Sequence, residues 1–180
     1  MLGMVFTEFV EMVESRFSPE MVDEIIEAVG APHGGAYTAV GYYPHEEILA
    51  MVTALSQRTG VPVTDLVRAF GRHLLGRFAV GHAEMFRHHA GLFDFIASVD
   101  GHIHVHVRRL YEQASLPRFS VLARDARRIE LLYESTRSMQ DLAVGLIEGA
   151  ADHFGEKVTV GQAPWAEPGR QGTLFTIVRV

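Results

Sequence analysis

The chain has 180 residues and a formal net charge of −6, from 22 acidic and 16 basic side chains. This length fits one compact domain with a substantial core. Because the chain contains no cysteine, disulfides, iron–sulfur clusters and thiolate metal sites are excluded within it, and a metal would need histidine, carboxylate or tyrosinate ligands. Fifteen basic residues are arginines scattered along the chain, unlike the basic face of a nucleic-acid-binding protein.

The apolar pattern also limits the location of the protein. The first eight residues contain no basic region of a secretion signal, and no apolar stretch approaches the roughly 20 residues that a bilayer span needs. We therefore expect a cytoplasmic protein without a membrane segment. No long heptad pattern is present, so we expect a monomer.

Helical spacing and end signals predict a helical N-terminal part. Ser18 and Pro19 provide an N-cap and a first-turn proline, Gly30 ends that helix, and Thr64 with Asp65 caps a later one. Residues 31–35 read as a loop and residues 37–43 as extended or irregular. The predicted helices cover 3–16, 19–29, 45–59, a segment from about 65 to beyond Phe78, 82–90 and 92–111.

After Pro117 the apolar period changes to that of strands. Two strands, 119–123 and 127–133, flank a tight turn at 124–127. Ser138 and Asp141 resemble a capping box for a helix over 139–154, and strands 157–161 and 172–180 follow, joined by a loop around 164–169. Helices followed by an antiparallel sheet of about four strands with one inserted helix define an α+β fold.

Three alternating histidines, His102, His104 and His106, are candidate metal ligands. On a strand all three would share one face and could hold a zinc or copper ion. On a helix, successive residues are about 100° apart, so His104 would point away from the other two. The surrounding apolar residues have helical spacing, which favours a single inward-facing His104.

A second candidate site is the run Tyr133-Glu134-Ser135-Thr136-Arg137. A strand end would place Tyr133 and Ser135 on one side and bring Arg137 within reach as the chain turns. A guanidinium group with two hydroxyl donors can bind a pair of carboxylates, such as haem propionates, with planar bidentate geometry. Together with one axial imidazole, this run indicates a haem-based sensor.

These motifs resemble those of the haem-nitric oxide/oxygen binding family, the bacterial relatives of the haem domain of soluble guanylate cyclase. The resemblance covers the whole chain. It implies haem b as the cofactor, His104 as the proximal iron ligand, Tyr133, Ser135 and Arg137 as propionate ligands, and Pro117 as a contact of the macrocycle. It also implies a distal helical subdomain over about 1–65 and a proximal subdomain over about 66–180. The matching segments are Ala69-Phe70-Gly71, Ile103-His104, Val107, Leu110-Tyr111, Leu116-Pro117, Tyr133-x-Ser135-x-Arg137 and Gly145 to Phe154.

The same resemblance implies which gas is bound. Oxygen-binding members carry a distal tyrosine where this chain has Leu142, and Phe9 and Leu74, both apolar, stand at other pocket-lining positions. Bound dioxygen needs a hydrogen-bond donor and nitric oxide does not, so we expect a nitric oxide sensor that also binds carbon monoxide. No kinase or cyclase segment is present, so we expect a separate partner, such as a histidine kinase or a cyclic-di-GMP enzyme.

Two alternatives remain open at this point. One is a His-ligated non-haem metal protein or enzyme that uses His102, His104 and His106. The other is a binding module for a different apolar ligand, with no metal. No paired-carboxylate, nucleophile or phosphate-loop motif is present, and we expect no enzymatic activity.

Overall fold

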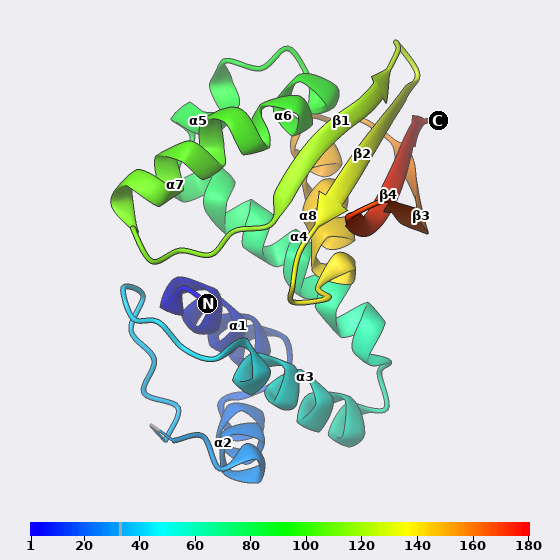
Figure 1. Ribbon diagram of the computed structural model, residues 1–180. Coiled ribbons are helices and arrows are strands. Elements are labelled where there is room, and N and C mark those ends of the chain that lie inside the picture. The colour runs from blue at the N-terminus through cyan, green and yellow to red at the C-terminus, as the bar shows by residue number, and fades with distance from the viewer. Residues whose placement is uncertain (33) are drawn as a thin grey trace.

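The computed structural model describes residues 1–32 and 34–180; residue 33, in the predicted loop, lies outside the described residues. The expected α+β class is confirmed: helices dominate the first 110 residues and an antiparallel sheet the remainder (Figure 1). No helix in these two ranges is long and apolar enough to cross a membrane. The helical elements are α1 (Gly3–Arg16), α2 (Pro19–Val29), α3 (His45–Thr59), α4 (Val63–Gly81), α5 (Glu84–Arg87), α6 (Leu92–Ser98), the π-helical turn η1 (Val99–Ile103) and α7 (His104–Leu110).

The sheet contains four antiparallel strands in the order β1-β2-β4-β3. Its inner face carries Ile129, Leu131, Phe175 and Ile177, which pack against α8 in one hydrophobic cluster. Because α8 is inserted between β2 and β3 in the sequence, the chain leaves the sheet, covers one face of it and returns. The elements are β1 (Arg118–Arg124), β2 (Arg128–Glu134), α8 (Gln140–His153), β3 (Val158–Glu167) and β4 (Arg170–Arg179).

Two hydrophobic clusters meet along α4. The first holds the inward faces of α1, α2 and α3 and includes Phe70 and Leu74 of α4. The second holds the sheet, α6 and α8, and includes Leu75 of α4. In Figure 1, α4 runs diagonally between the N-terminal helices and the half that contains the sheet. A single helix therefore contributes to both cores.

Close contact between α4 and α8 depends on glycine. A Cβ atom at Gly71 would lie 2.5 Å from the Leu142 carbonyl oxygen, and one at Gly145 would lie 2.2 Å from the Arg68 carbonyl oxygen. Both obstacles are backbone atoms, which cannot rotate away. Gly71 and Gly145 belong to two of the segments that carry the family resemblance. The two segments therefore meet at one crossing of α4 and α8.

We expect Gly145→Ala to destabilise the protein by about 1–3 kcal/mol or more, because the added methyl group must push α4 and α8 apart. Gly76→Ala is the matched control: it lies in α4, and a Cβ atom there meets nothing within 4 Å. That control should stabilise the protein by about 0.5–1 kcal/mol through helix propensity. Chemical unfolding measures both, and equal effects of the two substitutions would contradict the crossing.

Several predicted element ends are wrong. Helix α4 begins after Pro62 without a side-chain cap, so Thr64 and Asp65 lie inside it. Ser138 does not cap α8, because it has a positive φ of 48° and Met139 intervenes. The loop predicted at 164–169 belongs mostly to strands, since β3 and β4 pair from Trp165↔Gly172 to Glu167↔Arg170.

The predicted helix over 92–111 is interrupted. Its middle is the π-turn η1, in which the His104 amide donates to the Val99 carbonyl five residues earlier. The predicted helix over 82–90 shrinks to α5, a single turn. Patterns with a period of 3.6 residues cannot reveal one extra residue in a turn, and π-turns are rare outside functional sites.

The N-terminus of α1 docks on the segment before α3. Gly3 donates its amide to the Gly41 carbonyl at 2.7 Å, and Met4 donates to Ala39 at 2.9 Å. A Cβ atom at Gly3 would lie 1.9 Å from the Thr38 carbonyl oxygen, so no larger residue fits. These long-range bonds position the first turn of α1.

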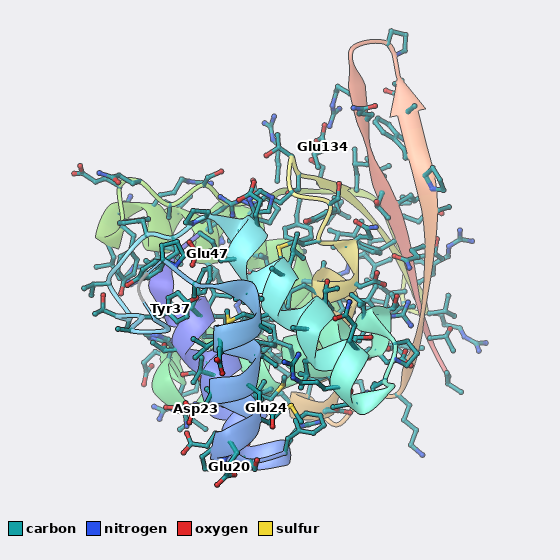
Figure 2. The ribbon with its side chains drawn as sticks, turned by 90° about the horizontal axis from the view of Figure 1, so that it is seen from below. Glu20, Asp23, Glu24, Tyr37, Glu47 and Glu134 are labelled. Atoms are coloured by element: carbon teal, nitrogen blue, oxygen red, sulfur yellow. The ribbon has the colours of Figure 1, made fainter. Side chains whose placement is uncertain are left out.

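Tyr37 packs against Phe6 and donates its hydroxyl to Glu47 at 3.2 Å. Both Tyr37 and Glu47 are labelled in Figure 2. Burial, with the Glu47 carboxylate beside it, raises the pKa of Tyr37 to about 12. Since this is above the ordinary value near 10, the contribution of Tyr37 to stability is complete below pH 10 and is lost as pH rises toward 12. Thermal unfolding across that range should show the loss, and Tyr37→Phe should show less of it.

Candidate functional site

A largely apolar cavity of about 320 Å³ lies where α1, α4, the segment from α6 to Phe119, and α8 meet. Its walls come from both hydrophobic clusters and from the segment that follows β2. The lining includes Leu2, Met4, Val5, Leu74, Leu75, Phe78, Ile96, Val99, Ile103, His104, Val107, Leu116, Pro117, Phe119, Tyr133, Leu142 and Leu146.

His104 stands in the wall of this cavity with a side chain that is 12% exposed. Its Nδ1 atom lies 3.4 Å from Oδ1 of Asp100, which also accepts the backbone amide of Phe119 at 3.3 Å. Burial lowers the pKa of His104, although Asp100 opposes this shift. Burial thus favours the neutral form of the imidazole. A neutral ring that donates from Nδ1 leaves Nε2 as the free metal-binding nitrogen.

The three candidate residues of the second motif, Tyr133, Ser135 and Arg137, all line the cavity. Tyr133, the buried one, is the last residue but one of β2, and burial raises the pKa of its hydroxyl against opposing hydrogen bonds with Ser135 and the Met139 backbone. Ser135 accepts the Arg137 amide at 3.2 Å. Among residues 1–32 and 34–180, no side chain forms a hydrogen bond or ion pair with the Arg137 guanidinium group. An unpaired cation in the wall of an apolar cavity is suited to an anionic ligand.

Aromatic rings connect the two motifs. Phe119 of β1 lies between them, with its ring centroid 5.7 Å from that of His104 and 5.4 Å from that of Tyr133. Its neighbour in the sequence, Arg118, pairs with Glu134 of β2. The pairing register of β1 and β2 therefore sets the distance between the imidazole and the hydroxyl group.

Three of the remaining predicted site residues line the cavity, and one does not. Leu74, Pro117 and Leu142 are lining residues. Phe9 is fully buried behind the wall, where its ring packs edge-on against Phe70 at 5.3 Å. Phe9 is thus a core residue among those described, and the predicted contact with a bound group does not follow from its position.

Sequence reasoning missed the contribution of the N-terminus. Met1, Leu2, Met4, Val5 and Tyr42 all line the cavity, placed there by the bonds between α1 and residues 38–43. Helical spacing identifies Val5 as inward-facing but cannot say what it faces. The only available signal was Gly3, whose lack of a side chain permits the close approach.

The three histidines do not form a metal site of their own. His104 and His106 belong to α7 and His102 to η1, which confirms the helical interpretation and removes the strand geometry that the three-histidine site requires. Throughout the described residues, no group of three or more His, Asp or Glu side chains could hold a metal ion. The structure therefore does not support the alternative of a metal site built from His102, His104 and His106.

The model of a family described as haem-NO-binding matches residues 2–162. The chain belongs to the haem-NO-binding family. Solved structures of this fold agree over the full length. An Fe(II) unliganded H-NOX protein from K. algicida is 31% identical with a TM-score of 0.92, covering 100% of this chain and 97% of that one. An H-NOX protein from S. oneidensis in the Fe(II)NO state is 27% identical with a TM-score of 0.90, covering 100% and 99%. No curated protein matches the chain.

The residues of the cavity suit the haem that the haem-NO-binding family binds. The walls are largely apolar, His104 contributes an imidazole whose side chain is only 12% exposed, and Arg137 lines the cavity together with the hydroxyl-bearing Tyr133 and Ser135. A porphyrin presents the matching features: an apolar ring, an iron atom that takes an axial nitrogen, and two carboxylates at one edge.

Proposed function

We propose that this protein is a haem b-based nitric oxide sensor that signals to a separate protein. The observation that supports this most strongly is that His104 and Arg137 line the same apolar cavity. The His104 side chain is only 12% exposed, and no side chain of the described residues pairs with the Arg137 guanidinium group. An apolar pocket alone would suit many ligands. An axial imidazole and a carboxylate clamp together are specific to a metalloporphyrin.

In this proposal His104 Nε2 would hold the haem iron, and Arg137, Tyr133 and Ser135 would hold the propionates. When bound, the haem would supply a ferrous iron that takes a diatomic gas. Binding of nitric oxide would weaken the bond to His104 and release its side chain. Because α7 carries His104 at its first turn, the release frees that helix from the cavity.

The distal wall supports selectivity for nitric oxide over dioxygen. It is built from Val5, Leu74, Phe78, Leu142 and Leu146, and none of these side chains can donate a hydrogen bond. Bound dioxygen carries partial negative charge and needs a donor, whereas nitric oxide does not. Carbon monoxide should also bind, but it should leave His104 in place and signal poorly.

The output in this proposal is a relative shift of the two parts of the protein. Residues 1–65 act as the distal subdomain and 66–180 as the proximal one, and the cavity lies where their clusters meet. A ligand shifts such an equilibrium only through different affinities for the two states, and the bond to His104 is the contact that differs. The expected partner is a histidine kinase or a cyclic-di-GMP enzyme.

The test is to expose the ferrous protein to nitric oxide and to carbon monoxide in parallel. Electron paramagnetic resonance of the nitric oxide complex reports whether a nitrogen ligand remains opposite the gas, and resonance Raman reports the bond to His104. We expect release of His104 with nitric oxide only. Purified protein without a Soret band would contradict haem binding, and retention of His104 in both complexes would contradict the switch.

We expect Arg137→Ala to accelerate loss of haem by about 10- to 100-fold, because hydrogen bonds to charged groups contribute roughly 1.5–3 kcal/mol. Ser135→Ala should have a smaller effect, since its hydroxyl carries no charge. The control is Arg127→Ala, in the exposed β1–β2 turn. Haem transfer to an acceptor protein measures all three rates, and equal rates for Arg137→Ala and Arg127→Ala would contradict the assignment.

A further inference from the structure

The contact that singles out His104 from its neighbours is Asp100. One carboxylate oxygen, Oδ1, lies 3.4 Å from His104 Nδ1 and accepts the Phe119 backbone amide at 3.3 Å. A carboxylate oxygen has two lone pairs, so it can accept both hydrogen bonds at once. Asp100 thus joins the imidazole to the backbone of β1.

The π-turn places this carboxylate. Asp100 is the second residue of η1, and the turn is closed by the His104 amide reaching back to Val99. The extra residue in the turn widens the helix immediately before His104. The carboxylate can then lie beside the ring and still reach the edge of β1, where Phe119 has its amide free of the β1–β2 ladder.

We propose that Asp100 is the positioning residue for His104: it holds the ring with Nε2 unprotonated and sets how firmly this nitrogen binds iron. A histidine that donates its other ring N–H to a carboxylate is a more basic metal ligand, and loss of such a partner typically weakens metal affinity about 10- to 100-fold. The inference rests on the proposed function, because it concerns the bond that nitric oxide must break. Beyond that function, we infer that the Asp100 carboxylate, which is bonded to the backbone of β1, sets the strength of the bond between His104 and iron.

Asp100 is not the only group that acts on the imidazole. The Pro117 backbone also raises the pKa of His104, while Arg108 lowers it. If Pro117 were the dominant partner, the charge of Asp100 would not matter to the iron bond. The two possibilities predict different results for one substitution.

The experiment compares Asp100→Asn and Asp100→Glu with the parent holoprotein. Asparagine keeps an oxygen for the Phe119 amide and removes the charge, so the fold should persist. We expect the iron–histidine stretching band of the ferrous protein to move to lower frequency and His104 release by nitric oxide to accelerate about 10-fold. Asp100→Glu, which keeps the charge, should lie between the parent and Asp100→Asn.

Asp94→Asn is the matched control. Asp94 lies in α6 and also ties this helical run to β1, through Arg124 at 2.5 Å, but it does not contact His104. Its stretching band and release rate should equal those of the parent. If both aspartate variants shift alike, the effect is structural and the proposal is overturned.

Three further outcomes would distinguish a failure of the role of Asp100 from a failure of the proposed sensor function. An unchanged band and release rate in Asp100→Asn overturn the role of Asp100 while the sensor function stands. A parent protein without an iron–histidine band overturns both. If Asp100→Asn loses haem and Asp94→Asn keeps it, the proposal is supported; equal loss of haem from both variants overturns it.

Discussion

Substitution of His104 by glycine is expected to abolish the iron–histidine band and to lower haem content severely. The reason is that, of the three described histidines that line the cavity, His82 and His106 are exposed and only His104 has a side chain that is largely buried. Free imidazole at millimolar concentration should enter the space left by the side chain and restore the native spectrum. The ferrous absorption and resonance Raman spectra, with and without imidazole, are the measurement.

The neighbouring histidines provide the control for this result. His102 and His106 flank His104 but are exposed, so His102→Gly and His106→Gly should keep the native spectrum. His106 is the stricter of the two, because it also lies at the cavity wall. A native spectrum in His104→Gly without imidazole would move the axial ligand to another residue and remove the basis of the proposed switch.

A single hydroxyl group on α8 is expected to change which gas the protein retains. Leu142 lines the cavity and packs against the first hydrophobic cluster, and tyrosine at this position would direct a donor into an otherwise apolar distal wall. We expect Leu142→Tyr to bind dioxygen in air, where the parent should remain unligated or oxidise. Absorption spectra of the ferrous proteins before and after exposure to air would show it.

Leu142→Phe separates the donor from the added bulk. Both aromatic side chains overfill the space of a leucine and should cost about 1–3 kcal/mol of stability, but only tyrosine can donate a hydrogen bond. If the phenylalanine variant also retained dioxygen, steric protection would be the cause. A parent protein that holds dioxygen in air would contradict selectivity based on the missing donor.

Elements with strong local end signals could be predicted from the sequence, often to the residue. Helix α2 begins after Ser18, which accepts the Met21 amide, and ends at Gly30 in the left-handed region. The strand order and the long β3–β4 hairpin could not be predicted in detail. Pro164 and Gly169 indicated a loop, yet cross-strand pairing carries both strands past Pro164 to the Pro168-Gly169 turn.

Some residues of the candidate site could likewise be predicted from the sequence, and others could not. His104, Ser135 and Arg137 stand out because their residue types and spacing imply chemistry, and the structure brings them to one cavity. Asp100 has no such pattern, since its partners are a ring four residues away and a strand amide nineteen residues away, joined by a π-turn. Phe9 was predicted from the family resemblance; it packs against Phe70 and is not among the residues that line the cavity, so its contact with a bound group stays a prediction.

Helix α4 has a consequence for how the protein loses its structure. Phe70 and Leu74 belong to the first core and Leu75 to the second, so neither core can open without exposing one side of the same helix. Cutting the chain near residue 65 would leave that side of α4 in water, and neither fragment would keep a closed apolar interior. The two parts should therefore unfold in one cooperative transition. A change in their relative orientation would then be a rotation of two folded parts about α4.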